Sequence, residues 1–278
     1  MESKVFLIYA ETQIHAGKGM DIGAVDLPIQ RERTTGFPII QGIKGALRAS
    51  IKDNKVRDIF GSEPTDNTNQ ETKPGRVAFS EAKILLFPVR NPESLFVWVT
   101  CPLALIRFLR NFEKSKVEGL IGQIEQTQIK DTEALTLWKE TYIWLEEINM
   151  NATNCPWLQE FATKIAEQAC ATQYIKEKLK KDIVVVNDKI FSQIVENMTD
   201  VVPRVRIDHE KGTVESGALW YEEYLPQETF MYFVSRKTAY SEQNDLESVE
   251  KALDNKVISI GGKETLGKGL VTVKVVSL

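Results

Sequence analysis

Cysteine and histidine are scarce in this chain, and their scarcity excludes several classes of protein. The 278 residues contain three cysteines, Cys101, Cys155 and Cys170, which lie far apart and form no CxxC pair. Only two histidines are present, His15 and His209. These counts exclude a disulfide framework and a zinc finger. An odd number of isolated cysteines is typical of a reducing compartment, so we expect a cytoplasmic protein.

Long apolar runs and targeting signals are also missing. No apolar stretch approaches the roughly 20 residues needed to cross a bilayer, so we expect no membrane partner. The N-terminal sequence Met1-Glu2-Ser3-Lys4 lacks the basic region and apolar core of a signal peptide. The aromatic signatures of an ordinary RRM domain are absent as well, so base stacking on a sheet surface is not expected.

Positive charge is concentrated in one segment of an otherwise acidic chain. The formal net charge is −4, which argues against a protein covered with nucleic-acid-binding charge. Between Arg31 and Arg57 the local net charge is +5. The basic residues there are Arg31, Arg33, Lys44, Arg48, Lys52, Lys55 and Arg57. Such a cluster can be a solvated surface, but its position after a glycine-rich loop favours a phosphate-binding site.

The loop before this cluster has glycines at positions 17, 19, 23 and 36 and contains His15 and Asp26. A carboxylate in such a loop can hold a hydrated divalent cation beside a phosphate. A histidine can serve as a general base for a ribose hydroxyl. Asp26 could equally be a turn or N-cap residue, and His15 a hydrogen-bonding loop residue. The residues alone leave these alternatives open.

Residues 38–51 have the periodicity of a helix. Three aliphatic residues recur every four positions and would face the core: Ile43, Leu47 and Ile51. Lys44 and Arg48 fall on the neighbouring stripe of the helix. With Gln41 near the helix start, they form a candidate phosphate-binding edge, because helix N-termini and glycine backbone bind phosphate well.

A second glycine-rich segment, residues 261–269, lies between two expected strands. Most of a P-loop is present, yet Gly269 stands where the magnesium-binding Ser or Thr would be, and a β-branched run follows. A nucleotide-hydrolysing P-loop is therefore disfavoured. The segment is either a hairpin that needs glycines or a backbone surface that approaches an extended phosphate chain. The candidate phosphate-binding residues are Gly261, Gly262, Lys263, Gly267, Lys268 and Gly269.

The order of the expected elements predicts an α+β protein with an elaborated ferredoxin-like or RRM-like core. Strands are expected at 4–11, 76–89, 95–101, 183–186, 228–236, 257–260 and 270–276, with a weaker signal at 189–194. A hairpin is expected at 204–220, with its turn at 210–212. Residues 242–255 read as a helix. Residues 102–182 are helical by pattern, with almost no strand signal. We therefore expect a core from residues 1–101 and 183–278, with 102–182 as a helical insertion.

Three stretches of the chain resemble the backbone subunits of type III-B CRISPR RNA-silencing complexes, which belong to the RAMP superfamily of RNA-binding proteins. The resemblance is dense over residues 12–48, 203–225 and 258–270 and weak over the insertion. It implies a metal-dependent endoribonuclease that binds guide crRNA and cleaves complementary target RNA. Its partners would be further copies of itself and other subunits of the effector complex.

The resemblance also implies roles for individual residues. Asp26 would be the residue on which target cleavage depends, and it would bind Mg²⁺ or Mn²⁺ only together with RNA. Glu222 or Glu223 would assist. The hairpin near 203–219 would be a thumb with Arg204, Arg206, His209 and Lys211 as its polar residues. Two other functions stay open: a non-catalytic RNA-binding scaffold, and an endoribonuclease that processes guide precursors.

Overall fold

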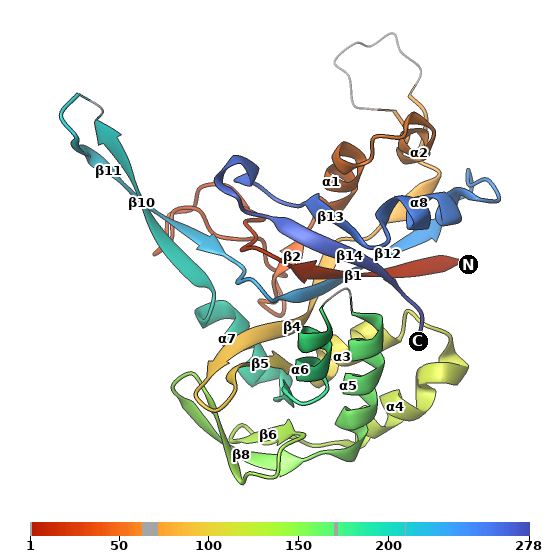
Figure 1. The fold of residues 1–278 in the computed structure, drawn as a ribbon, viewed down its shortest axis with the longest axis vertical. Coiled ribbons are helices and arrows are strands. Elements are labelled where there is room, and N and C mark those ends of the chain that lie inside the picture. Colours follow the sequence, from red (N-terminus) through yellow and green to blue (C-terminus); the bar gives the residue numbers. More distant parts are fainter. Residues whose placement is uncertain (1, 63–71, 170–171, 209) are drawn as a thin grey trace.

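The protein is built around one large mixed sheet, shown in Figure 1. The computed structural model describes residues 2–62, 72–169, 172–208 and 210–278. The strands of the sheet are β1 (Ser3–Ala10), β2 (Ile39–Ile40), β3 (Val77–Phe79), β4 (Ala82–Asn91), β5 (Leu95–Thr100), β6 (Glu133–Thr136), β7 (Tyr142–Leu145), β8 (Ile148–Asn154), β9 (Ile183–Val185), β12 (Phe230–Lys237), β13 (Lys256–Ser259) and β14 (Leu270–Val276). Their order is β13-β14-β1-β12-β4-β5-β9-β6-β8-β7, with β2 on β4 and β3 on β12.

Helices cover both faces of this sheet. They are α1 (Ile43–Ser50), α2 (Asn54–Arg57), α3 (Pro102–Leu109), α4 (Lys114–Gln126), α5 (Pro156–Gln168), α6 (Gln173–Leu179), α7 (Asp188–Asn197) and α8 (Asp245–Leu253), with 3₁₀ turns η1 (Asp58–Phe60) and η2 (Glu264–Leu266). Among the helices of the described residues, none is long and apolar enough to cross a membrane.

The ferredoxin-like core is confirmed by the order of its strands. Along the chain the core elements run β1, α1, β4, β12, α8, β14, and in the sheet the strands lie in the order β14-β1-β12-β4. Each neighbouring pair is antiparallel. This is the arrangement of a β-α-β-β-α-β unit.

The two faces of β1 explain why helices pack on both sides. Phe6 and Ile8 belong to one apolar cluster with Leu47 of α1 and Val249 of α8. The alternate residues of β1 pack in a second cluster with residues of α3, α4 and α5. Since successive strand residues point to opposite faces, both faces of β1 are buried. Figure 1 shows α1, α2 and α8 on one side of the strands and α3 to α6 on the other.

The expectation that residues 102–182 are purely helical is wrong. This region contains four helices, but β6, β7 and β8 lie between them and extend the large sheet. In β7, Tyr142 and Trp144 are exposed whereas Ile143 and Leu145 are buried. That alternation has the period of two of a strand. The helix was expected because Trp138, Tyr142 and Leu145 lie four and three positions apart, which is also a helical spacing. The division into a core and an insertion stays a prediction.

The expected strand at 189–194 is also wrong, because these residues lie in α7. The Asn187 side chain accepts a hydrogen bond from the Ile190 backbone N–H at 2.8 Å and caps the helix N-terminus. The expected strand 76–89 is divided into β3 and β4, and the helix expected from residue 38 begins at Ile43 after the short strand β2.

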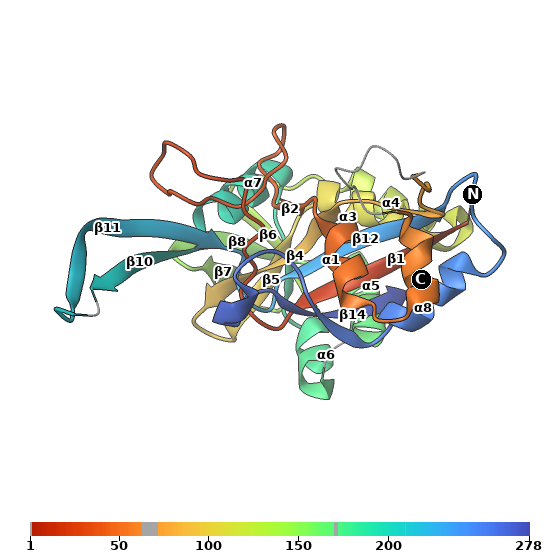
Figure 2. The same cartoon turned by 90° about the horizontal axis from the view of Figure 1, so that it is seen from above.

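The expected hairpin is confirmed. Strands β10 (Asp200–Asp208) and β11 (Thr213–Tyr224) pair with each other in a separate two-stranded sheet, and an isolated bridge joins β11 to Leu27. Gly212 in its turn has φ +66°, a value that favours glycine. The hairpin projects from the body of the molecule in both views (Figures 1 and 2).

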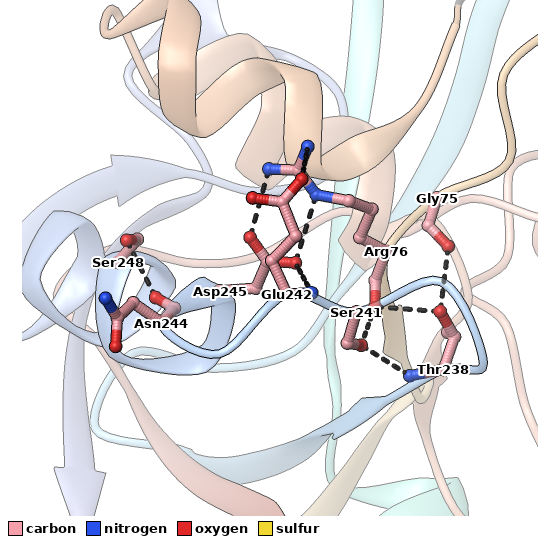
Figure 3. A network of polar contacts seen from close by, with 8 residues as sticks. All are labelled: Gly75, Arg76, Thr238, Ser241, Glu242, Asn244, Asp245 and Ser248. Atoms are coloured by element: carbon pink, nitrogen blue, oxygen red, sulfur yellow. Dashed lines mark hydrogen bonds and ion pairs between the residues drawn. The ribbon is translucent and has the colours of Figure 1, made fainter.

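A polar network fastens β3 to the start of α8, as Figure 3 shows. Two nitrogens of Arg76 donate to the two carboxylate oxygens of Asp245, each at 3.0 Å. Arg76 also forms a 3.1 Å ion pair with Glu242. Asp245 is buried, so this bidentate pair is shielded from water.

Candidate functional site

Asp26 lies at the base of the hairpin, where it contacts a residue that is distant in the sequence. Its Oδ2 atom accepts a hydrogen bond from the backbone N–H of Tyr221 at 2.7 Å. The next residue, Leu27, donates its N–H to the Tyr221 carbonyl at 3.1 Å and accepts from the Glu223 N–H at 3.0 Å. The loop therefore runs beside β11 as an added strand segment. Figure 1 shows the red-to-orange loop of residues 12–37 at this end of the hairpin.

Glu223 anchors the next part of the same loop. One of its carboxylate oxygens accepts a hydrogen bond from the Ile29 N–H at 3.0 Å. The other forms a 2.5 Å ion pair with Arg31 and accepts a hydrogen bond from Thr199 at 2.7 Å. Glu223 is buried. Its contacts fasten the segment after Asp26 to β11, so the carboxylate is engaged in holding the loop.

Glu222 has a different set of partners. It is 1% exposed, and its carboxylate contacts Lys263 at 2.6 Å, Trp220 at 2.9 Å and Arg204 at 3.2 Å, together with the Tyr224 hydroxyl. Burial raises the pKa of Glu222, but the hydrogen bonds from Lys263, Tyr224 and Trp220 outweigh burial and lower it to about 2. Glu222 is therefore a carboxylate at neutral pH.

His15 is buried between the loop and the glycine-rich segment. Its Nδ1 atom lies 2.8 Å from the Glu223 carbonyl oxygen, and its own carbonyl accepts the Gly262 N–H at 2.8 Å. A carbonyl can only accept, so Nδ1 carries the proton when the ring is neutral. Nε2 lies against Gly17, where an added Cβ would come within 2.7 Å of it.

The glycine-rich segment packs on the loop that contains His15. Gly261 has φ +88°, and a Cβ at this position would lie 2.6 Å from the His15 carbonyl oxygen. The Gly269 N–H donates to the Gln13 carbonyl at 2.8 Å. Lys263 contacts Glu222, and Lys268 contacts the Gln13 side chain and lies over the Tyr224 ring. Glycine is needed here for close backbone approach.

The candidate residues of α1 lie outside this cluster but adjoin the same loop. The backbone N–H of Gln41 donates to the Gln30 side chain at 2.9 Å, and Gln30 donates to the Gly17 carbonyl at 3.0 Å. Lys44 is exposed on α1, and Arg48 is half-buried one turn later. Helix α1 therefore continues the surface that begins at the loop.

The polar residues of the thumb are divided between its base and its tip. Arg204 is at the base, where it contacts Glu222 and donates to the Tyr224 hydroxyl at 3.2 Å. Arg206 is exposed and lies 3.5 Å from Glu215, and Lys211 is exposed at the turn. His209 lies outside the described residues.

The protein groups near Asp26 do not form a complete metal cage. In the part of the chain that the structure describes, no three His, Cys, Asp or Glu side chains gather into a metal site. Mg²⁺ is often bound through one or two carboxylates, with water and phosphate oxygens completing its shell. The single carboxylate of Asp26 therefore fits a cation whose other ligands come from RNA and water.

Sequence reasoning missed several groups that build this site. The Tyr221 backbone N–H holds Asp26, and no residue type signals a backbone donor. Arg31 was recognised only as a member of the basic cluster, although it pairs with Glu223. Trp220 and Tyr224 both donate to Glu222. The expected hairpin ended at residue 220, but β11 continues to Tyr224, and residues two positions on either side of Glu222 in a strand share one face with it.

Comparisons with known proteins identify the family of the chain. A model of the RAMP superfamily matches residues 7–272. The chain is 37% identical to the CRISPR system Cmr endoribonuclease Cmr4 of Pyrococcus furiosus over a 289-residue alignment that covers 98% of this chain and 95% of that protein. It is 25% identical to the CRISPR system CMR subunit Cmr4 of Saccharolobus solfataricus, with 98% and 96% covered.

Solved structures show the same fold. The crystal structure of oligomeric Cmr4 from Pyrococcus furiosus has a TM-score of 0.73 and 30% identity, with 99% of this chain and 98% of that chain covered. A chain in the cryo-EM structure of the type III-B Cmr-beta bound to cognate target RNA has a TM-score of 0.76 and 23% identity, with 99% and 97% covered. Because the family model spans nearly the whole sequence and a relative exceeds 30% identity along its length, the chain belongs to the RAMP superfamily.

Proposed function

We propose that this chain is a multicopy backbone subunit of a type III-B CRISPR effector complex that binds guide crRNA and cleaves complementary target RNA. The observation that carries the proposal is the fixed position of Asp26. One loop places this carboxylate at the base of a projecting hairpin and fastens it there through Tyr221, Leu27 and Glu223. The likeness to a relative named as a Cmr endoribonuclease supports the assignment.

The proposed reaction is attack of a ribose 2′-hydroxyl on the adjacent target phosphate. The new 2′-oxygen–phosphorus bond replaces the bond to the 5′-oxygen of the next nucleotide, and the products are a 2′,3′-cyclic phosphate and a 5′-hydroxyl. The proton lost by the 2′-hydroxyl and the proton gained by the leaving 5′-oxygen are exchanged with water. Asp26 is the residue that faces the reacting group. A Mg²⁺ or Mn²⁺ ion bound with the RNA would stabilise charge on that phosphate. Glu222 and Glu223 act as positioning residues, because each already has several hydrogen-bond partners in the protein. His15 is buried, which favours a positioning role over the general-base role expected from its residue type.

The guide RNA is held by its backbone in this proposal. Lys44 and Arg48 on α1 and the glycine-rich segment 261–269 contact guide phosphates, which carry no sequence information. Base pairing between guide and target then supplies the specificity. The hairpin β10–β11 is the thumb that reaches into the guide–target duplex.

The substitution Asp26→Asn tests the catalytic assignment. It keeps the size of the side chain and an oxygen for the Tyr221 N–H, but removes the negative charge. Single-turnover cleavage of a complementary RNA by reassembled complexes should fall by at least about two orders of magnitude. Chelation of divalent ions should have the same effect on the unaltered protein. Guide and target binding should be nearly unchanged.

Asp21→Asn is the matched control, because Asp21 is an exposed aspartate of the same loop that pairs with Lys18. This variant should cleave at the rate of the unaltered protein. Full-rate cleavage by the Asp26→Asn complex would overturn the catalytic assignment and leave a non-catalytic RNA-binding scaffold in its place.

A further inference from the structure

A basic cavity lies on the sheet face opposite α1 and α8. Its volume is about 330 Å³, and its floor is formed by the side chains of Tyr232, Val234 and Arg236 on β12 and Lys83 on β4. The residues Arg107, Arg110 and Asn111 at the end of α3 form its wall. The second apolar cluster, which joins β1 to α3, α4 and α5, covers other parts of this face. The cavity lies where these helices do not cover the strands.

The cavity has more positive than negative charge. Lys83 and Arg107 share Glu32, at 3.7 Å and 2.8 Å, and Lys83 also lies 3.4 Å from Glu81. Arg110 and Arg236 also line the cavity, and neither has a carboxylate partner within the described residues. Four cations therefore face two carboxylates, which leaves two guanidinium groups for an anion.

The side chain of Tyr232 lines the same space. Tyr232 is 3% exposed, and in the described part of the chain its hydroxyl has no hydrogen-bond partner. Burial raises the pKa of Tyr232, so the hydroxyl is protonated at neutral pH and can donate. An oxygen of a bound anion would accept this hydrogen bond.

We propose that this cavity binds a phosphate group of a nucleotide or of an RNA strand. The guanidinium groups of Arg110 and Arg236 supply paired N–H donors that match phosphate oxygens. Tyr232 donates from the floor. The volume exceeds that of a phosphate alone and lies at the lower end of small-molecule sites. The cavity contains no part of the Asp26 site, so it is a second phosphate-binding site on the chain.

Isothermal titration of the full-length chain with three probes tests this proposal: inorganic phosphate, 5′-AMP and the dinucleotide UpU. The unaltered chain should bind at least one probe saturably. Arg110→Gln with Arg236→Gln should weaken that binding by at least roughly tenfold, since charge-assisted hydrogen bonds are lost. Tyr232→Phe removes one hydroxyl and should weaken it by about threefold to tenfold.

The probes distinguish the source of the phosphate. Binding of UpU points to the phosphodiester backbone of an RNA strand. Binding of 5′-AMP and phosphate without UpU points to a monoester, such as a free nucleotide or an RNA 5′ end. Asp26→Asn should bind the probes like the unaltered chain. The cleavage assay therefore tests the role of Asp26, and the probe titration tests the cavity independently of it.

Lys130→Gln with Lys139→Gln is the control for lost charge, because both lysines are exposed and line no part of this cavity. This variant should bind the probes normally. The proposal is overturned if no probe binds the unaltered chain. It is also overturned if the arginine variant, with an unchanged circular dichroism spectrum and melting temperature, binds as tightly as the lysine control.

Discussion

Glu222 and Glu223 are adjacent in sequence but hold different parts of the molecule. Successive residues of a strand point to opposite faces, so on β11 one carboxylate faces Lys263 of the glycine-rich segment and the other faces Arg31 of the Asp26 loop. The pair therefore fastens two loops to the base of one hairpin. In the proposed function, the pair acts through the position of these loops.

Glu222 should make stability depend on pH in the acid range. Its pKa falls from an ordinary value of 4.5 to about 2 in the fold. Its contribution is therefore complete above pH 4.5 and is lost as the pH falls toward 2. At neutral pH, Glu222→Gln should lower the free energy of unfolding by an amount on the order of 3 kcal/mol. Urea unfolding at several pH values measures this difference, which should shrink as the pH decreases.

The exposed Glu264 provides the comparison for that experiment. Glu264→Gln should change the free energy of unfolding little at any pH, because exposed charges contribute little. A difference for Glu222→Gln that stays constant from neutral pH to pH 3 would contradict the stated role of its carboxylate.

At the scale of elements, α1 provides the basic edge and α8 stabilises the core from the same side of the sheet. Arg48 is in the last turn of α1, where a cation also interacts favourably with the helix dipole. The start of α8 is fastened to β3 by Arg76 and the buried Asp245 (Figure 3). The two helices therefore carry charge in different settings: Lys44 of α1 is exposed, whereas Asp245 of α8 is buried.

Lys44→Ala with Arg48→Ala should weaken guide RNA binding about equally for all sequences. The two cations would contact phosphates, so the slope of log affinity against log salt should decrease by about 1 to 2. Filter binding across a salt series measures both quantities. Lys251→Ala with Lys256→Ala removes the same charge elsewhere and should have a smaller effect on the slope. An unchanged slope for the α1 variant would place the guide site elsewhere.

Arg76→Met should destabilise the fold without touching the proposed RNA site. Removing one partner of a buried ion pair leaves the Asp245 carboxylate without its countercharge, at a cost of about 3 kcal/mol. Chemical denaturation should show a lower midpoint. Asp245→Asn in the same background should recover part of the loss, because it removes the unpaired charge. A midpoint equal to that of the unaltered chain would show that the network contributes nothing.

At the scale of the whole molecule, an acidic chain carries local basic surfaces and a projecting hairpin. The formal net charge of −4 limits non-specific binding to nucleic acid. The hairpin strands form a two-stranded sheet separate from the large one, and several of their apolar residues are exposed, including Val205, Ile207 and Leu219. Such a surface is typical of a protein that binds partners.

Native mass spectrometry of the chain expressed with its guide RNA should show several copies per RNA. Copies that each bind a short run of phosphates can line up along one strand. The number of copies should increase when the guide is lengthened. A particle that keeps one copy per guide at every guide length would rule out the multicopy backbone.

The sequence by itself determined the ferredoxin-like core and the hairpin, because both depend on local patterns. A continuous run of β-forming apolar residues marks β1, alternating residues mark β14, and the glycine at 212 marks the turn of the hairpin. The prediction that residues 102–182 are helical was wrong because the short strand β7 has too few residues to distinguish a period of two from a helical spacing.

Only the tertiary structure decided which side chains meet. Asp26 and Tyr221 are 195 positions apart, and Glu222 and Lys263 are 41 apart. Their contacts arise because β11, the long loop and the glycine-rich segment converge at one end of the sheet. The basic cavity on β12 likewise joins residues from β3, β4, β12 and α3. Periodicity within a segment reports which face is buried, but contacts between distant segments depend on how the whole chain packs.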